Sequence, residues 1–378
     1  MLSFWEKQYL LNYDVIIIGS GIVGLSTAAS IKEADATKRV MVLERAILPT
    51  GASTKNAGFA CIGSLTEMLD DLSHMPENEV IELVELRYKG LADLRQRLGD
   101  KQIGYAENGS YELIGEAELP CLNELDRVNQ ILRPLLKGDA FTICNDKISA
   151  FGFNANYTQS LISNNYEGEL NTGMMMRSLI DYCLHLGIEI KTGCEVYNIE
   201  EAGDAVNVTV NHEYLNEQIV FKGQQTVVCT NAFTRHFYPL IDVQPGRGQV
   251  LITKPIEGLK LKGVFHFDKG YYYFRNVGNR VLFGGGRNMD FEGEETTDFA
   301  YNNKVQQVLI NKLQEIILPN QPFEVEDWWT GIMAFGQSKR PILARQSQRI
   351  FIGVRMGGMG VAIGSRVGAQ LAQMVLNG

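Results

Sequence analysis

The chain begins with a pattern of strand, helix and strand. Two short apolar runs flank a helix-forming segment. Residues 14–18 (DVIII) form a β-branched run, as expected of a strand that is buried on both faces. Residues 25–34 favour a helix, and residues 39–43 (RVMVL) predict a second strand. This order predicts a β-α-β unit with two parallel strands.

The same alternation of buried strands and helices returns along the chain. In residues 79–98 the apolar side chains fall along one side of a predicted helix, and a further buried strand is predicted at 226–230. The remaining predicted helices cover 173–186, 302–317 and 361–376, and the remaining strands cover 189–191, 206–211, 250–253, 270–275, 281–283 and 350–354. From Gln249 onward the chain is rich in strands.

The turn after the first strand carries a dinucleotide-binding pattern. Gly19, Gly21 and Gly24 form G-x-G-x-x-G, and Glu44 follows at the end of the second strand. Gly19 allows the tight turn, Gly21 lets a pyrophosphate approach the backbone, and Gly24 lets the helix pack closely on the strand. The helix N-terminus presents free N–H groups to the phosphates, and Glu44 can accept hydrogen bonds from a ribose. Glu44 would repel a 2′-phosphate, which argues against NADP.

A strand, a glycine turn and a helix also occur near the C-terminus, at residues 350–376. The sequence therefore predicts an α/β protein with a discontinuous Rossmann-type domain and a second, β-rich α+β domain. We expect the first domain to comprise residues 1–76, 156–239 and 326–378, and the second to comprise residues 77–155 and 240–325.

Composition and charge limit the kinds of partner and site that we expect. The chain has 378 residues, a net charge of −9 and no cluster of Lys and Arg, so nucleic acid is not an expected partner. No apolar run reaches the roughly 18 residues that span a membrane, and residues 1–12 lack a secretory signal pattern. The six cysteines are scattered without a C-x-x-C pair, and the histidines show no metal-ligand spacing. We expect a cytoplasmic protein without a metal site.

Several further motifs, in a shared order, resemble those of the D-amino-acid oxidase superfamily of FAD-dependent oxidoreductases. This superfamily includes glycine, sarcosine and γ-glutamylputrescine oxidases. Beyond the glycine pattern and Glu44, the matching segments are residues 51–58, 195–196, 227–232, 245–249, 271–275, 284–286, 329–333 and 357–360.

The resemblance implies that FAD is the cofactor and indicates which residues contact it. These are Gly19, Ser20, Gly21, Ile22, Val23, Gly24, Glu44, Arg45, Ser53, Thr54, Lys55, Asn56, Ala57, Gly58, Val196, Thr230, Asn231, Ala232, Arg247, Gly331, Ile332, Gly357, Gly358, Met359, Gly360 and Val361. In this set Gly357–Gly360 would meet the flavin pyrimidine edge, with the following helix dipole favouring negative charge there. Lys55 either lies near the flavin or is solvated, and Arg247 braces either the structure or the flavin region.

The substrate side is expected to involve Tyr273, Arg287, Arg275, Trp329 and Met333. Tyr271 and Tyr273 share one face of a strand, so one face lines the cavity and the other fills the core. Arg275 and Arg287 can each bind a carboxylate in bidentate fashion, or lie on the surface. Arg287 is favoured as the carboxylate-binding residue because it follows the glycine turn at 284–286.

The chain departs from the family pattern at four positions. Met333 stands where amino-acid oxidases carry an arginine, and Phe283 and Ala362 stand where sarcosine oxidases carry lysines. Ile332 stands where some relatives tether the flavin through a cysteine. These departures predict non-covalent FAD, a substrate other than a simple α-amino acid, and either O2 or another electron acceptor.

The function expected from the resemblance is oxidation of a C–N bond in a small amine or amino-acid derivative. Hydride passes to flavin N5, and the imine product then hydrolyses. The alternative is a flavin-dependent 2-hydroxy-acid dehydrogenase. Two other classes remain open, a flavin-binding sensor and a tRNA-modifying oxidase, although the acidic charge balance disfavours the latter.

Overall fold

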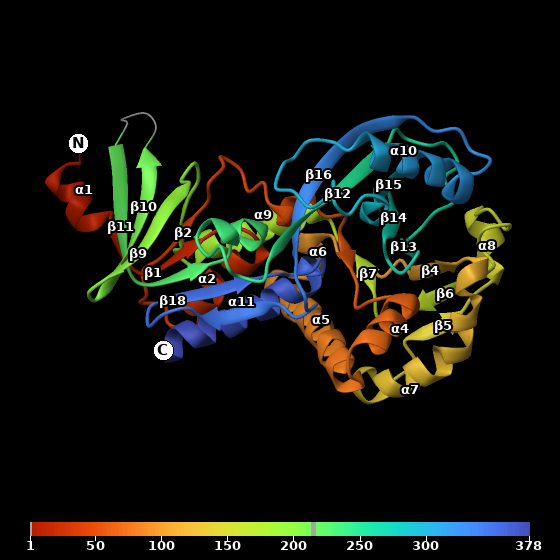
Figure 1. The fold of residues 1–378 in the computed structure, drawn as a ribbon, viewed down its shortest axis with the longest axis horizontal. Helices are drawn as coiled ribbons and strands as arrows, with labels where there is room; N and C mark the ends of the chain where they lie inside the picture. Colours follow the sequence, from red (N-terminus) through yellow and green to blue (C-terminus); the bar gives the residue numbers. More distant parts are fainter. Residues whose placement is uncertain (1, 213–216) are drawn as a thin grey trace.

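The computed structural model describes residues 2–212 and 217–378, and the chain forms two regions that are each built on a β-sheet (Figure 1). In the first region the strands follow the order β17-β18-β11-β1-β2-β8, and β10 and β9 continue from β11. The pairs β1–β2, β2–β8, β1–β11 and β11–β18 are parallel. The bounds of these strands are β1 (Asn12–Ile18), β2 (Val40–Leu43), β8 (Glu189–Lys191), β9 (Val196–Ala202), β10 (Ala205–His212), β11 (Glu217–Val228), β17 (Ile342–Arg345) and β18 (Ile350–Val354).

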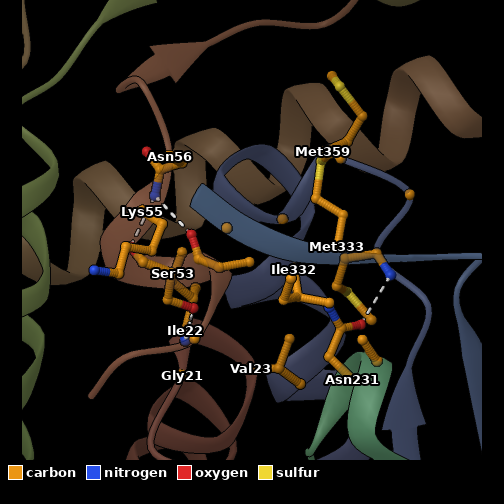
Figure 2. Close-up of a pocket in the computed structure, with 18 of the residues that line it drawn as sticks. Gly21, Ile22, Val23, Ser53, Lys55, Asn56, Asn231, Ile332, Met333 and Met359 are labelled. Atoms are coloured by element: carbon orange, nitrogen blue, oxygen red, sulfur yellow. Dashed lines mark hydrogen bonds between the residues drawn. The ribbon is translucent and has the colours of Figure 1, made fainter. Parts of the chain in front are cut away.

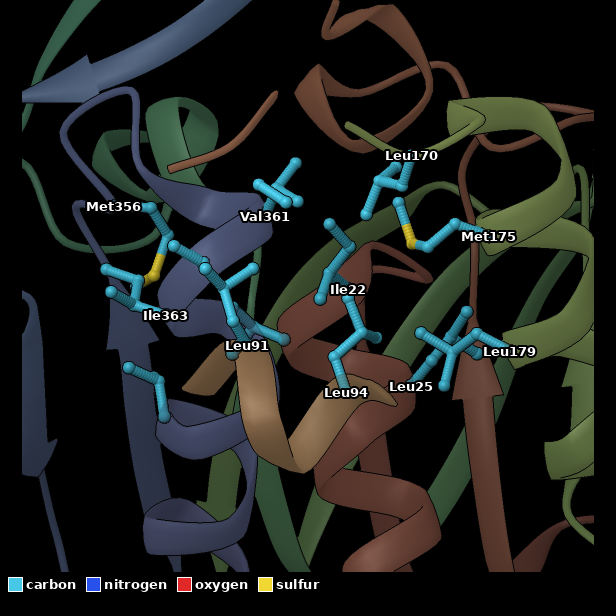
Figure 3. Packing of buried hydrophobic residues seen from close by; sticks show 14 of the residues in the cluster. Ile22, Leu25, Leu91, Leu94, Leu170, Met175, Leu179, Met356, Val361 and Ile363 are labelled. Carbon is cyan, nitrogen blue, oxygen red and sulfur yellow. The ribbon is translucent and has the colours of Figure 1, made fainter. Parts of the chain in front are cut away.

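Four helices cover one face of this sheet: α2 (Ile22–Ala34), α5 (Glu77–Leu98), α9 (Thr172–His185) and α11 (Gly360–Asn377). Their apolar side chains share one core, in which Leu25, Leu94 and Leu179 are buried (Figure 3). Close contact between α11 and α2 depends on Gly368, because a Cβ there would lie 2.8 Å from the backbone nitrogen of Thr27. The first and last predicted helices are therefore packed directly against each other.

The opposite face of the first sheet is covered by the antiparallel strands β9, β10 and the start of β11. Val206, Val208 and Val210 of β10 are buried with Ile16 and Ile18 of β1. Strand β11 is twelve residues long and belongs to both layers, because it leaves this antiparallel group and then joins the parallel strands.

The second region contains a largely antiparallel sheet with the order β16-β12-β15-β14-β13-β4-β6-β5. One face packs on α10 (Asn303–Lys312) through an aromatic core that includes Phe265, Phe274 and Phe283, and the other face turns toward the first region. The strands are β4 (Ser110–Ile114), β5 (Phe141–Ile143), β6 (Ser160–Asn164), β12 (Gln244–Thr253), β13 (Val264–Phe267), β14 (Tyr272–Val277), β15 (Arg280–Gly285) and β16 (Val325–Phe335). The predicted fold class is confirmed.

Smaller elements connect the two regions. A short ribbon pairs β3 (Phe59–Ala60) with β7 (Gly168–Glu169), and α4 (Leu65–His74) precedes α5. The other helices are α1 (Phe4–Tyr9), α3 (Ala52–Lys55), α6 (Asp100–Ile103), α7 (Leu125–Leu136) and α8 (Asp146–Phe151), with 3-10 turns at Glu116–Glu124, Asn231–His236 and Arg287–Met289 and a π turn at Leu313–Ile317.

The observed regions differ from the expected boundaries at three elements. Helix α5 was expected in the second domain, but Leu91 and Leu94 pack in the core of the first region. Strands β6 and β16 were expected in the first domain, but both pair within the second sheet. The chain crosses between the regions more often than a pattern of separate insertions predicts.

Candidate active site

A cavity of about 940 Å³ runs between the two sheets and is lined by loops from both ends of the chain (Figure 2). At one end, strand β1 stops at Ile18 and the chain turns through Gly19, whose φ is +105°. A Cβ on Gly24 would lie 2.0 Å from the Gly19 carbonyl oxygen, so glycine is required where α2 crosses the turn. The N-terminus of α2 is thereby held against the cavity wall.

Glu44 lies at the end of β2 beside this turn and lines the cavity, although its side chain is mostly buried. Its Oε2 accepts hydrogen bonds from the Ser20 backbone N–H at 3.1 Å and from the Ser20 hydroxyl at 2.7 Å. Next to it, the Arg45 guanidinium lies 3.8 Å from the centre of the Phe233 ring. The carboxylate is therefore fixed in orientation before any ligand reaches it.

The segment from Ala52 to Gly58 forms one side wall of the cavity. The Ser53 hydroxyl accepts a hydrogen bond from the Ile22 N–H at the start of α2, at 3.0 Å. The Asn56 side-chain oxygen forms hydrogen bonds within the protein, because it accepts one from the Gly58 N–H and one from the Thr172 hydroxyl. Lys55 lines the cavity, and its ammonium group has no hydrogen-bond or ion-pair partner among the described residues.

The loops after β11 and β18 meet at the back of the cavity. Asn231, with a φ of +47°, accepts hydrogen bonds through its side-chain oxygen from Arg355 N–H and Met356 N–H. Thr230 and Ala232 beside it, and Val196 at the start of β9, also line the cavity. This contact ties the first sheet to the glycine turn that precedes α11.

That second glycine turn lines the other end of the cavity. Gly357 and Gly358 have φ values of +55° and +81°, and α11 begins at Gly360. The backbone N–H of Gly358 has no acceptor among the described residues. Two helix N-termini, those of α2 and α11, thus border one cavity.

The second sheet contributes aromatic side chains to the remaining wall. Tyr271 and Tyr273 line the cavity, whereas Tyr272 and Phe274 are buried in the aromatic core, as the alternation along the strand predicts. The Tyr273 hydroxyl has no hydrogen-bond partner among the described residues. Burial raises the pKa of Tyr273 to about 12, so its hydroxyl stays protonated at neutral pH and can donate a hydrogen bond.

Arg287 lies on the same wall, just after the turn that ends β15. Its guanidinium carbon is 4.3 Å from the centre of the Phe335 ring and 5.0 Å from that of Phe291. Its Nε is buried without a hydrogen-bond partner, and no carboxylate of the described residues forms an ion pair with it. Burial lowers the pKa of Arg287 from its ordinary value. A partly buried cation without an anion is a ready site for a carboxylate.

Six of the expected site residues do not line the cavity: Gly24, Thr54, Gly58, Arg247, Arg275 and Trp329. The Arg275 guanidinium donates to the carbonyl oxygens of Gly58 and Leu170, at 3.0 and 2.8 Å. Arg247 forms a buried bidentate pair with Glu294, at 3.0 and 2.9 Å, which holds the loop before α10. Trp329 donates from its indole N–H to the Lys55 carbonyl oxygen, at 2.9 Å, behind the side wall.

Phe283, which the resemblance places where sarcosine oxidases carry a lysine, does not line the cavity. Phe283 is buried in the aromatic core on the far face of the sheet, so it does not face the cavity. Leu282 instead packs with Ala57 and Val250 on the near face. Neither position offers an ammonium group. Met333, Gly331 and Ile332 do line the cavity, as expected.

Several cavity residues were not expected. His266 of β13 and Cys61 face each other there, with the thiol sulfur 3.5 Å from Nε2 of the imidazole. Glu67 of α4 also lines the cavity, and its carboxylate is paired with Arg87 at 3.1 Å. The single polar residue in the apolar run 264–267 was the only sign in the sequence that pointed to His266.

Comparison with known proteins gives a family and a fold. The family model described as FAD dependent oxidoreductase matches residues 14–374. Among curated protein sequences, none matches the chain. Among the helices of the described residues, none combines the length and apolar character that crossing a membrane requires.

Solved structures of similar fold cover nearly the whole chain. Glycine oxidase from Geobacillus kaustophilus is 18% identical with a TM-score of 0.78, and the match covers 97% of this chain and 95% of that chain. L-proline dehydrogenase from P. horikoshii is 15% identical with a TM-score of 0.79, covering 97% and 94%. L-amino acid deaminase from Proteus myxofaciens, solved in complex with anthranilate, is 15% identical with a TM-score of 0.75, covering 97% and 90%.

Proposed function

The chain belongs to the D-amino-acid oxidase family of FAD-dependent oxidoreductases, and we propose that it oxidises a C–N bond in a small amine or amino-acid derivative. The bound FAD supplies a hydride acceptor at N5. The product imine would then hydrolyse in water. The unpaired Arg287 guanidinium on the cavity wall is the observation behind a carboxylate-bearing substrate, because it identifies an end of the cavity that suits an anionic group, while the choice of a C–N bond follows from the family.

The cavity fits an extended FAD. Its length is bordered by the two helix N-termini, and Gly21 keeps a side chain away from the phosphate-binding turn. We assign Glu44 to the ribose, Val196 to the adenine, and Gly357–Gly360 to the pyrimidine edge of the flavin. Ile332 offers no nucleophile, which supports non-covalent binding.

The substrate would lie between the flavin and the second sheet. Arg287 would hold a substrate carboxylate by two parallel N–H···O bonds, and the Tyr273 hydroxyl would donate to a second polar group. Tyr271 and Met333 line the cavity and shape the space beside them. These contacts would place the reacting C–H bond over the flavin, and alignment of that bond is the main task of the protein in hydride transfer.

Three solved structures of this fold are of enzymes named for amino acids: a glycine oxidase, an L-proline dehydrogenase and an L-amino acid deaminase. In the present chain the cation comes from the turn after β15, while Met333 occupies the position on β16 where the family resemblance expects an arginine. We therefore favour an N-substituted amino acid or another amine with a carboxylate over a simple α-amino acid.

Oxidation of a 2-hydroxy acid is the second candidate, because Arg287 would bind its carboxylate equally well. The test is anaerobic mixing of the FAD-loaded protein with a panel of amines, N-alkyl amino acids and 2-hydroxy acids, following the flavin absorbance. Bleaching by carboxylate-bearing amines supports the proposal, and bleaching by hydroxy acids alone overturns it. Reoxidation of the bleached protein in air, compared with an artificial acceptor dye, separates an oxidase from a dehydrogenase.

A further inference from the structure

Cys61, Glu167 and His266 converge at the edge of the cavity from three segments that are far apart in the sequence. Cys61 follows β3, Glu167 precedes β7, and His266 lies on β13. Sγ of Cys61 is 3.5 Å from Nε2 of His266, and Nε2 is 3.9 Å from Oε2 of Glu167. Among the described residues this is the one cluster of such side chains whose donor atoms all lie within 4.8 Å of one another.

A thiolate, an imidazole and a carboxylate are the three ligand types that zinc takes in proteins. Zinc–ligand distances of about 2.3 Å to sulfur and about 2.0–2.2 Å to nitrogen and oxygen set the expected spacing of the donors in a tetrahedral site. They place sulfur and nitrogen about 3.6 Å apart and nitrogen and oxygen about 3.4 Å apart. The observed Sγ–Nε2 distance already agrees, and the Nε2–Oε2 distance would need to shorten by about half an ångström.

The Glu167 carboxylate is fixed from behind, as the ligands of a metal site usually are. Its Oε1 accepts hydrogen bonds from Ile62 N–H at 2.7 Å and Gly63 N–H at 2.8 Å. Its Oε2 accepts from the Ser110 hydroxyl at 2.6 Å and lies 3.9 Å from Nε2 of His266. Three hydrogen bonds therefore hold the carboxylate in place beside Cys61 and His266.

The charges of the cluster also suit a divalent cation. Cys61 and Glu167 are buried, and no Lys or Arg of the described residues pairs with the Glu167 carboxylate. One divalent ion with a thiolate, a carboxylate and a neutral imidazole has no net charge, which lowers the cost of burying all three ligands. Other charged or titratable groups near His266 are Glu67, Glu112 and Tyr273; of these, Glu67 is paired with Arg87. The Arg275 guanidinium also lies close enough to Cys61 to act on its thiol, and it is paired with Glu169.

From this convergence we propose that Cys61, Glu167 and His266 bind one zinc ion at the edge of the cavity. Cys61 and His266 line the cavity, whereas Glu167 lies behind them, so the fourth position of a tetrahedral ion is open to a water or to a donor atom of a molecule in the cavity. The site needs neither FAD nor substrate to form.

The experiment measures bound zinc per chain in the FAD-loaded protein after equilibration with zinc chloride and removal of free metal. Wild-type protein should retain one zinc per chain, and Cys61→Ala and His266→Gln should each weaken binding by more than about 100-fold, because each removes a direct ligand. Cys194→Ala is the matched control, since Cys194 also lines the cavity but has no such neighbours. It should retain the metal in full.

Zinc-edge X-ray absorption of the loaded protein should show one sulfur neighbour and two or three nitrogen or oxygen neighbours. Absence of stoichiometric zinc in the wild type, or equal retention by Cys61→Ala, would show that the pair is an ordinary thiol–imidazole contact and would overturn the proposal. The flavin absorbance of each variant is recorded separately. A protein that binds zinc but no flavin, or flavin but no zinc, therefore tests this site and the proposed function independently.

Discussion

The two ends of the cavity are built by different means. The end at Gly19 to Gly24 is a continuous stretch of chain, and its shape depends on backbone atoms that approach too closely for any Cβ at Gly24. The end at Arg287 and Tyr273 is made of side chains from β14 and from the turn after its neighbour β15, and His266 and Cys61 come to it from other segments. The first end depends on the absence of side chains, and the second on their identity.

This difference indicates how each end should respond to mutation. A single added methyl group can disrupt the glycine turn at the first end, because moving the neighbouring backbone atoms away costs free energy. At the second end the strands persist when one side chain changes, so binding and turnover should change while the fold is retained. The following variants test this contrast.

The largest effect is expected from Gly24→Ala. The new Cβ would lie 2.0 Å from the Gly19 carbonyl oxygen, so the turn or α2 must shift at a cost of roughly 3 kcal/mol or more. We expect loss of FAD and a lower melting temperature, measured by flavin absorbance and thermal unfolding. Gly51→Ala is the control, because nothing lies within 4 Å of a Cβ there. A yellow Gly24→Ala protein of normal stability would contradict the backbone-built description.

Glu112 on β4 should make the second region sensitive to pH. Burial raises the pKa of Glu112 from 4.5 to about 7, against hydrogen bonds from Thr66 that favour the charged form. Between these values the folded carboxyl keeps its proton while the unfolded one releases it, so stability is lost as pH rises. The loss from pH 4.5 to 7 should be about 3 kcal/mol.

Glu112→Gln should remove this slope, so that the variant gains stability relative to wild type as pH rises from 5 to 7. Chemical unfolding at several pH values measures the free energy of unfolding of both proteins. Glu257→Gln serves as the control, because that side chain is exposed. Parallel pH dependence in wild type and Glu112→Gln would show that this carboxyl ionises normally.

Arg287→Ala should separate binding from cofactor retention. Loss of a paired, charge-assisted contact of about 1.5–3 kcal/mol corresponds to a KM increase of about 10- to 150-fold for a carboxylate-bearing substrate. FAD content should not change. Arg280→Ala at the opposite end of β15, where the guanidinium pairs with Glu326, should leave KM unchanged. Steady-state kinetics with the fastest flavin-reducing substrate decides the outcome, and an unaltered KM in Arg287→Ala excludes the residue from the site.

The smallest effect is expected from Tyr273→Phe. Its hydroxyl has no partner in the protein, so stability should stay the same while kcat/KM falls about 3- to 10-fold through the loss of one hydrogen bond to substrate. Tyr272→Phe is a matched variant, because that hydroxyl is also unpartnered but lies in the aromatic core. If both variants retain full activity, Tyr273 only fills space.

The same contrast explains what the sequence could predict. The turn at Gly19, the strand before it and the helix after it form one local pattern, and the structure has all three. The period of two along β14 placed Tyr271 and Tyr273 on the cavity face correctly. Arg275 shares that face but lies farther along the strand, under Gly58, and Trp329 on β16 lies behind Lys55. Periodicity predicts the face of a strand but not the part of it that borders a cavity.

The hydrophobic pattern of the sequence could not predict strand register or the contacts between distant segments. Phe283 and Leu282 are neighbours in the chain but lie on opposite faces of the sheet, so the expectation that Phe283 faces the cavity depended on a strand register that the sequence does not give. His266 was missed because β13 is only four residues long. Its neighbours in space are also distant in the sequence: Cys61 lies 205 positions before it and Glu167 lies 99 positions before it.

The direct packing of α11 on α2 has a consequence for the newly made polypeptide. The turn at Gly19 emerges early during synthesis, but the α11 surface that covers α2, including Gly368, emerges only much later. Until then the apolar side of α2, with Leu25 and Ile22, lacks its neighbour. A nascent chain must therefore keep this surface from aggregating, and firm cofactor loading has to wait until residues 357–377 have left the ribosome.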